Sequence, residues 1–201
     1  MDYKKVKPTK LLWVDLEMTG LDVQKDKIIE VAAIITDFDY KTLATYQSYV
    51  HQSEEFTHSR MDVGNFWPNY PANRDQFYKN LPAAPNEDTV EAEFLSFIKA
   101  AFGDEPAILA GNSIYNDRKF IEVAWPTLTK ALHYRMLDVS SLKIIMQGQK
   151  RGVYAKKDVH RAMNDIEASI AELQYYLKKL KQFLNTQKKM EQAYNSNRLV
   201  E

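Results

Sequence analysis

Two carboxylates lie two residues apart in an otherwise apolar segment near the start of the chain, LLWVDLEMTGLD. Residues i and i+2 of a β-strand point to the same side, so Asp15 and Glu17 would share one face while the apolar residues alternating with them share the other. Like charges side by side on a mostly buried strand repel each other and resist removal from water. A bound cation, an Arg or Lys partner, or exposure at the strand end would each compensate, and these two residues alone leave the three open.

Two further acids and a histidine lie close to the predicted starts of helices. Asp117 follows a short apolar strand, and Asp165 lies one turn into a long helix, five residues after His160. In open α/β sheets, strand ends and neighbouring helix N-termini gather at one place. The four acids can therefore project into one cleft, where Mg²⁺ or Mn²⁺ would offset their charge, because both ions prefer oxygen ligands.

This arrangement favours hydrolysis of a phosphodiester. Two cations about 3.5–4 Å apart would clamp phosphoryl oxygens, and the intrinsic pKa of His160 suits a general base. Each residue alone has a plainer explanation. Asp117 could simply stabilise a helix start, Asp165 could lie on a solvated helix face, and His160 could be a surface or capping residue.

Composition sets broader limits. The 201 residues favour a single domain, and 45% hydrophobic with 27% charged residues is ordinary for a globular protein. Lys plus Arg and Asp plus Glu both number 27, so any nucleic-acid site must rest on local clusters. The absence of cysteine excludes disulfides and thiol chemistry and fits a reducing cytoplasm. We expect a cytoplasmic protein, because no apolar run could span a membrane and the first ten residues lack a signal-peptide core.

The elements that would position these residues alternate along the chain. Apolar runs and turn residues predict strands at 10–17, 27–38, 42–52, 106–112 and 133–140, and helices at 86–103, 116–126, from 140 to about 147, and 161–184. This order predicts an α/β fold with a mixed five-stranded sheet, three antiparallel strands first, and flanking helices. We expect one domain over residues 1–184, with an irregular excursion at 53–85 near the site and a polar tail at 185–201.

Several longer motifs resemble those of a known family. WVDLEMTGLD, GNSIYNDRKF, HYRMLDVSSLK and HRAMNDIEASIAEL are similar to segments of the oligoribonucleases, a branch of the DEDDh, RNase H-like 3′-to-5′ exonucleases. The resemblance runs from about residue 10 to residue 180. It implies the RNase H-like exonuclease fold, two divalent cations (Mg²⁺ or Mn²⁺), and release of nucleoside 5′-monophosphates from short RNA. The motifs match all five catalytic residues of the family: Asp15, Glu17, Asp117, His160 and Asp165.

The resemblance also implies roles for these residues. Asp15, Glu17 and Asp165 would hold one cation, and Asp15 would bridge to a second, with Asp117 assisting through water. His160 would deprotonate the attacking water. A homodimer is implied as well, because two of the matching residues resemble ones that a partner subunit lends to the site. The substrate contacts that the resemblance suggests are Met18, Thr19, Leu21, Asn112, Ser113 and the partner-lent pair Tyr134 and Arg135.

One segment departs from the family pattern. After VHQS, the chain carries Trp67 but neither a following His nor an SGL turn, and Asn116 replaces a frequent Gln. The preference for dinucleotides is therefore open. Two alternatives also stay open: an exonuclease with broader or single-stranded DNA specificity, and a catalytically idle nucleic-acid-binding protein on the same fold.

Overall fold

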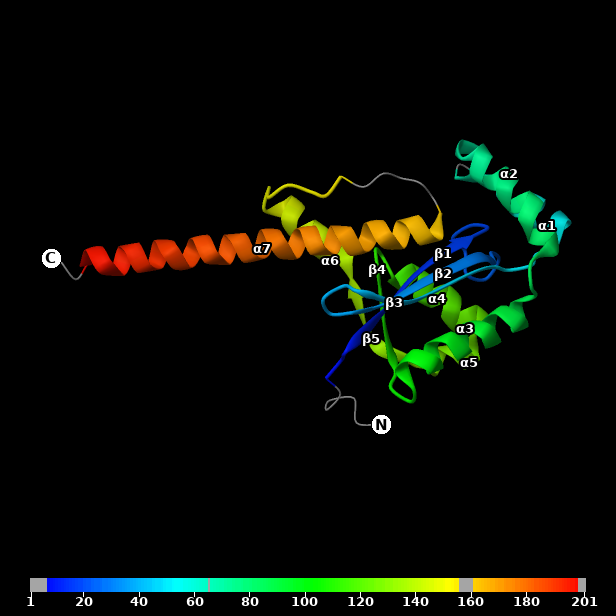
Figure 1. Cartoon of the computed structure of the whole chain (residues 1–201). Helices are drawn as coiled ribbons and strands as arrows, with labels where there is room; N and C mark the ends of the chain where they lie inside the picture. Colours follow the sequence, from blue (N-terminus) through cyan, green and yellow to red (C-terminus); the bar gives the residue numbers. More distant parts are fainter. Residues whose placement is uncertain (1–6, 65, 156–160, 199–201) are drawn as a thin grey trace.

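The computed structural model describes residues 7–64, 66–155 and 161–198, with side chains up to Glu191. A five-stranded sheet lies between two layers of helices (Figure 1). The strands are β1 (Lys10–Met18), β2 (Ile28–Asp37), β3 (Thr42–Tyr49), β4 (Ala107–Gly111) and β5 (Leu132–Asp138). The helices are α1 (Glu54–Met61), α2 (Pro71–Asn80), α3 (Glu87–Phe102), α4 (Tyr115–Ala124), α5 (Pro126–Thr129), α6 (Val139–Gly148) and α7 (Ala162–Arg198), with 3₁₀ helices η1 (Trp67–Asn69) and η2 (Leu81–Ala83).

The sheet has the order β3-β2-β1-β4-β5. Strands β1, β2 and β3 pair antiparallel, whereas β4 is parallel to both β1 and β5. The mixed five-stranded sheet with three antiparallel strands first is therefore confirmed. Its centre is β1, which is buried between β2 and β4 and carries the first acidic pair.

Alternate side chains of β1 pack into two separate hydrophobic cores, one on each face of the sheet. Leu12, Val14 and Leu16 pack in the core shared with α3, α4 and α5. Leu11 and Trp13 pack in the core shared with α6 and α7 on the opposite face. Because this alternation continues along the strand, the side chains that follow Trp13 on its own face turn toward α7.

Residues 53–85 differ from the prediction. The sequence predicts an irregular excursion, but the structure has two helices and two 3₁₀ turns there, which we call the helical insert. Its apolar side chains pack with β2 in a small cluster of their own, made of Ile29, Met61, Trp67, Phe77 and Leu81. The segment contains four prolines, and neither α1 nor α2 has a pronounced apolar face. The hydrophobic periodicity that marks a helix is therefore weak in this part of the sequence.

The last helix is also longer than predicted. The sequence predicts a helix to residue 184 and a frayed polar tail, but α7 continues to Arg198 and projects beyond the sheet (Figure 1). Residues 185–198 contain no Gly or Pro and several good helix formers, so nothing in this stretch ends the helix. Within the described chain, no helix, α7 included, is both long and apolar enough to cross a bilayer.

Candidate functional site

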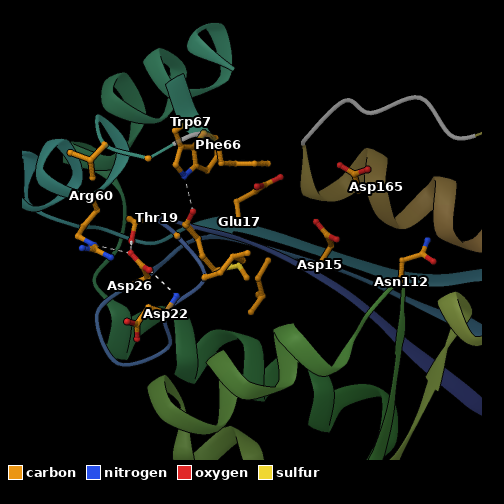
Figure 2. A pocket seen from close by; sticks show the side chains of 16 residues that line it. Asp15, Glu17, Thr19, Asp22, Asp26, Arg60, Phe66, Trp67, Asn112 and Asp165 are labelled. Carbon is orange, nitrogen blue, oxygen red and sulfur yellow. Dashed lines mark hydrogen bonds and ion pairs between the residues drawn. The ribbon is translucent and has the colours of Figure 1, made fainter. Parts of the chain in front are cut away.

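Three carboxylates converge where β1 passes beneath the first turns of α7. One oxygen each from Asp15, Glu17 and Asp165 lies within 4.8 Å of the other two (Figure 2). Glu17 and Asp165 are buried, and Asp15 is half-buried. The prediction that Asp15 and Glu17 share one face of a strand is confirmed. The expected approach of Asp165, which is distant in sequence, is also confirmed. We call these three residues the acidic cluster.

Local patterns explain why the acidic cluster forms. Asp15 and Glu17 continue the face of β1 on which Leu11 and Trp13 pack against α7. On α7, the buried Ala162 and Ile166 lie on the same side of the helix as Asp165. The packing that seats the helix on the sheet therefore also brings its carboxylate over the strand.

The acidic cluster is electrostatically strained without a counter-ion. The pKa of Glu17 is raised to about 8, first by desolvation and then by the charges of Glu30 and Asp165, while Arg161 acts in the opposite direction. Glu30 is fully buried and faces Glu17 across the β1–β2 ladder. A divalent cation would relieve this repulsion, because it interacts with ionised carboxylates of the cluster together.

Asp117 is not one of the three converging acids, but it lies near enough for its charge to contribute to the raised pKa of Glu17. It belongs to α4, and its Oδ1 accepts a hydrogen bond from the backbone N–H of Leu16 at 3.0 Å. The β1–β4 ladder pairs only as far as Trp13, which leaves this N–H available. Burial raises the pKa of Asp117 to about 7. The structure therefore brings together three of the four acids and sets Asp117 against the strand backbone between the other two.

His160, the predicted general base, lies outside the described residues. Lys156 and Lys157, which belong to a basic segment at 150–161, lie outside them as well. The described chain resumes at Arg161, whose backbone N–H donates to Oδ2 of Asp165 at 3.1 Å. The role of His160 therefore stays a prediction from the sequence.

A cavity of about 640 Å³ adjoins the acidic cluster. Its walls come from the end of β1 and the following turn, the helical insert, the end of β4 and the start of α7 (Figure 2). Of the predicted substrate contacts, Met18, Thr19, Leu21 and Asn112 line it, whereas Ser113, Tyr134 and Arg135 do not. The lining combines the carboxylates of the acidic cluster with apolar side chains of the turn and the insert, and Asp22, Asp26 and Arg60 lie on the side away from Asp15 and Asp165 (Figure 2).

The turn after β1 is fixed by Asp26. Its carboxylate accepts hydrogen bonds from the Thr19 hydroxyl at 3.0 Å, the Asp22 N–H at 2.9 Å and Nε of Arg60 at 2.8 Å. It also fills the space where a side chain on Gly20 would lie, since a Cβ there would come within 2.5 Å of Oδ2. Thr19 thus serves the turn with its hydroxyl, and Arg60 ties the turn to α1.

Two aromatic residues of the insert have opposite exposures. Trp67 is buried and donates its indole N–H to the Met18 carbonyl at 3.0 Å, so it packs the insert against the end of β1. Phe66 beside it is 46% exposed and lines the cavity, as does Leu21, which is 78% exposed. The sequence reasoning missed Phe66 and Arg60, and the aromatic NFWPNY stretch was the signal that could have singled out Phe66.

The remaining predicted contacts lie nearby in internal networks or at the sheet edge. The Asn112 amide donates to Ser169 and Glu172, both at 2.9 Å. The Ser113 N–H donates to Asp138 and to the Ser140 hydroxyl, both at 3.0 Å, while its side chain stays exposed. Tyr134 and Arg135 are exposed on the edge strand β5.

Comparison with known proteins places the chain among nucleases. Residues 12–173 match the RNase T exonuclease family. An oligoribonuclease of Francisella tularensis subsp. novicida is 40% identical over 173 residues, covering 85% of this chain and 95% of that protein. The mitochondrial oligoribonuclease of Homo sapiens is 38% identical over 177 residues, covering 83% of this chain and 71% of that protein.

A solved structure shares the fold. Escherichia coli exonuclease I, crystallised with a 5cy-dA13 oligonucleotide, aligns with a TM-score of 0.60 at 16% identity. The alignment covers 89% of this chain but only 43% of exonuclease I. At this identity the likeness concerns the fold alone, and it agrees with the strand order described above.

Proposed function

Because this chain belongs to the RNase T exonuclease family, in its oligoribonuclease branch, we propose that it is a metal-dependent 3′-to-5′ exoribonuclease. Its products would be nucleoside 5′-monophosphates released from short oligoribonucleotides. The observation that carries the proposal is the acidic cluster, which lines a cavity together with exposed apolar side chains.

The acidic cluster fits a divalent cation. Its donors are all carboxylate oxygens, which favours a hard ion such as Mg²⁺ or Mn²⁺. The buried Glu17, with its pKa raised to about 8, is the group that such an ion would relieve most. Asp15, Glu17 and Asp165 would hold the first cation. Asp15 would share a second, toward which the nearby Asp117 would contribute through water.

The residues of this chain would then divide the work of hydrolysis. Divalent cations, when bound, lower the pKa of a coordinated water and stabilise negative charge on phosphoryl oxygens. His160, by the sequence prediction, would accept the proton of the attacking water. The N–H of Arg161 orients the Asp165 carboxylate, and the Leu16 N–H orients that of Asp117. Both carboxylates are thus fixed before substrate arrives.

The cavity would hold the 3′-terminal nucleotides of a single strand. Leu21, Val63 and Phe66 are exposed apolar residues of its lining, and the side chains of Leu21 and Phe66 suit contact with a base face. Met18 and Thr19 shape the turn between them and the acidic cluster. Ser113, beside Ser140, would contact a phosphate further along the strand.

A homodimer would complete the site with Tyr134 and Arg135 of a second copy. Both residues are exposed on the edge strand β5, where the sheet has no further neighbour among the described residues. Ile144 and Ile145 of the following helix α6 are 67% and 45% exposed, which gives this side an apolar surface to bury. Light scattering of the purified chain would test this, with Ile144→Glu as the disrupting variant. The cytoplasmic location expected from the sequence stays part of the proposal, and cell fractionation would test it.

Hydrolysis of 5′-labelled RNA of two, five and twelve nucleotides tests the function. Reactions contain Mg²⁺, Mn²⁺ or EDTA, beside a matched DNA set. We expect stepwise loss of 3′ nucleotides from RNA with either cation and none with EDTA. Equal cleavage of RNA and DNA would favour the broader exonuclease. No cleavage with either cation would refute the enzyme and favour an idle nucleic-acid-binding protein.

A further inference from the structure

The side chain of Arg161, at the start of α7, contacts residues from three other elements. Its guanidinium donates to the Tyr49 hydroxyl at 2.7 Å and to Oε1 of Gln76, and lies 3.5 Å from Oε1 of Glu30. Its side chain is only 22% exposed. One residue therefore links α7 to β2, β3 and α2.

The partner on β2 is a buried acid next to the acidic cluster. Glu30 is fully buried, accepts a hydrogen bond from Gln47 at 2.7 Å, and has no hydrogen-bond partner for Oε2 among the described residues. It lies opposite Glu17 in the sheet. Arg161 thus brings positive charge to a place where two carboxylates would otherwise repel each other.

The backbone of Arg161 holds the third carboxylate. Its N–H donates to Oδ2 of Asp165, and its carbonyl accepts the N–H of Asp165 at 3.0 Å. These bonds close the first turn of α7 around a residue of the acidic cluster. In the sequence, the predicted base His160 directly precedes Arg161. A shift of Arg161 would therefore move the Asp165 turn as well.

On the other side, Arg161 reaches the helical insert. The guanidinium carbon lies 5.9 Å from the ring centre of Phe77, and Phe77 packs edge-on against Trp67 at 5.3 Å. Trp67 in turn donates to the Met18 carbonyl at the cavity wall. Contiguous contacts therefore run from the acidic cluster through Arg161 and the insert to the end of β1.

We propose that Arg161 is a positioning residue that couples the acidic cluster to the helical insert, so that a correctly packed insert is needed for full turnover. The inference rests on the proposed function, since Asp165 is one of the candidate metal ligands there. Two plainer explanations compete with this role for a basic residue beside the site: electrostatic guidance of phosphates and simple exposure to solvent.

A charge-preserving substitution separates these readings. Arg161→Lys keeps the positive charge near Glu30, but one ammonium group cannot reproduce the planar fork that reaches Glu30, Tyr49 and Gln76. For a positioning residue we expect kcat on a five-nucleotide RNA to fall about 10-fold, with KM changed less than about 3-fold. A phosphate guide predicts the reverse, a raised KM with kcat retained.

Arg74→Lys is a matched control. Arg74 lies on α2, its side chain is also 22% exposed, and it pairs with Asp62 and Asp75 and covers the Tyr78 ring. Its contacts stay within the insert. We expect kcat of this variant to equal that of the wild type.

Hydrogen exchange gives a readout that does not depend on activity. Arg161→Lys should speed amide exchange in residues 71–80, far from it in sequence, whereas Gln76→Ala should speed exchange in the first turn of α7. Unchanged exchange in both segments would overturn the coupling even if kcat fell. If the wild type cleaved no RNA, the proposed function would fail while exchange would still decide the coupling. Loss of folding in Arg161→Lys would leave the decision to Gln76→Ala.

Discussion

The acidic cluster and the helical insert border the same cavity, but different contacts hold them in place. The strand pair Asp15 and Glu17 follows from side-chain alternation, and Asp165 from one turn of helix. The insert is held by bonds that span long stretches of sequence, from Arg60 to Asp26 over 34 residues and from Trp67 to Met18 over 49 residues. We therefore expect the carboxylates of the cluster to set turnover and the cavity-lining side chains of the insert to set substrate binding, with Arg161 coupling the packing of the two regions.

Removing one carboxylate of the cluster should have the largest effect. We expect Asp165→Asn to lower kcat roughly 10³-fold, because it deletes a metal ligand while keeping the side-chain shape. Stability in EDTA should not fall, since repulsion within the cluster decreases. Asp104→Asn, at an exposed acid outside the cavity, is the control. Activity above a tenth of wild type would remove Asp165 from the mechanism.

Asp117 tests whether the metal site extends from the acidic cluster to α4. Asp117→Asn can still accept the Leu16 N–H through its amide oxygen, so the fold should persist. We expect kcat to fall roughly 10²-fold if the charge serves a second cation. Steady-state kinetics at saturating Mn²⁺ would measure this. A loss below threefold would mean that Asp117 only supports the strand.

The raised pKa of Glu17 predicts how stability depends on pH. Its pKa rises from 4.5 to about 8 on folding, so the folded state binds more protons between these values. Stability is therefore highest at low pH within this window and falls as pH rises toward 8. In EDTA, we expect wild type to lose roughly 2 kcal/mol more than Glu17→Gln between pH 5 and pH 9. Urea unfolding at both pH values would test this, and equal losses would contradict it.

The cavity-lining ring of Phe66 in the insert should affect substrate binding rather than chemistry. Phe66→Ala removes an exposed ring from the cavity, and we expect KM for a five-nucleotide RNA to rise about 10-fold with kcat nearly unchanged. Phe38→Ala, at a ring of similar exposure far from the cavity, should change neither constant. A fall in kcat with KM unchanged would contradict the division between the two regions.

The end of α7 should matter least. Residues 181–191 are exposed, and the helix projects beyond the sheet (Figure 1). Truncation after Leu184 should change kcat/KM less than about twofold. A larger loss would mean that the end of α7 contributes to activity in addition to the acidic cluster and the helical insert.

The same contrast explains what could be predicted from sequence. Period-two patterning along β1 and the apolar residues of α7 are local signals, and with the other apolar runs they predict a mixed sheet that starts with three antiparallel strands and the approach of the acids. Phe66, Arg60 and Arg161 obtain their roles from contacts with distant segments. No local pattern specifies such contacts. The insert and the length of α7 were missed for related reasons, since neither has a continuous apolar face that marks its limits.

Diffraction from Mn²⁺-soaked crystals would test the central claim most directly. The anomalous signal of the ion locates it without reference to activity. We predict a peak bound by oxygens of Asp15, Glu17 and Asp165, lost in Asp165→Asn crystals. A peak elsewhere, or none at millimolar Mn²⁺, would contradict the assignment of the acidic cluster as the metal centre of this exonuclease.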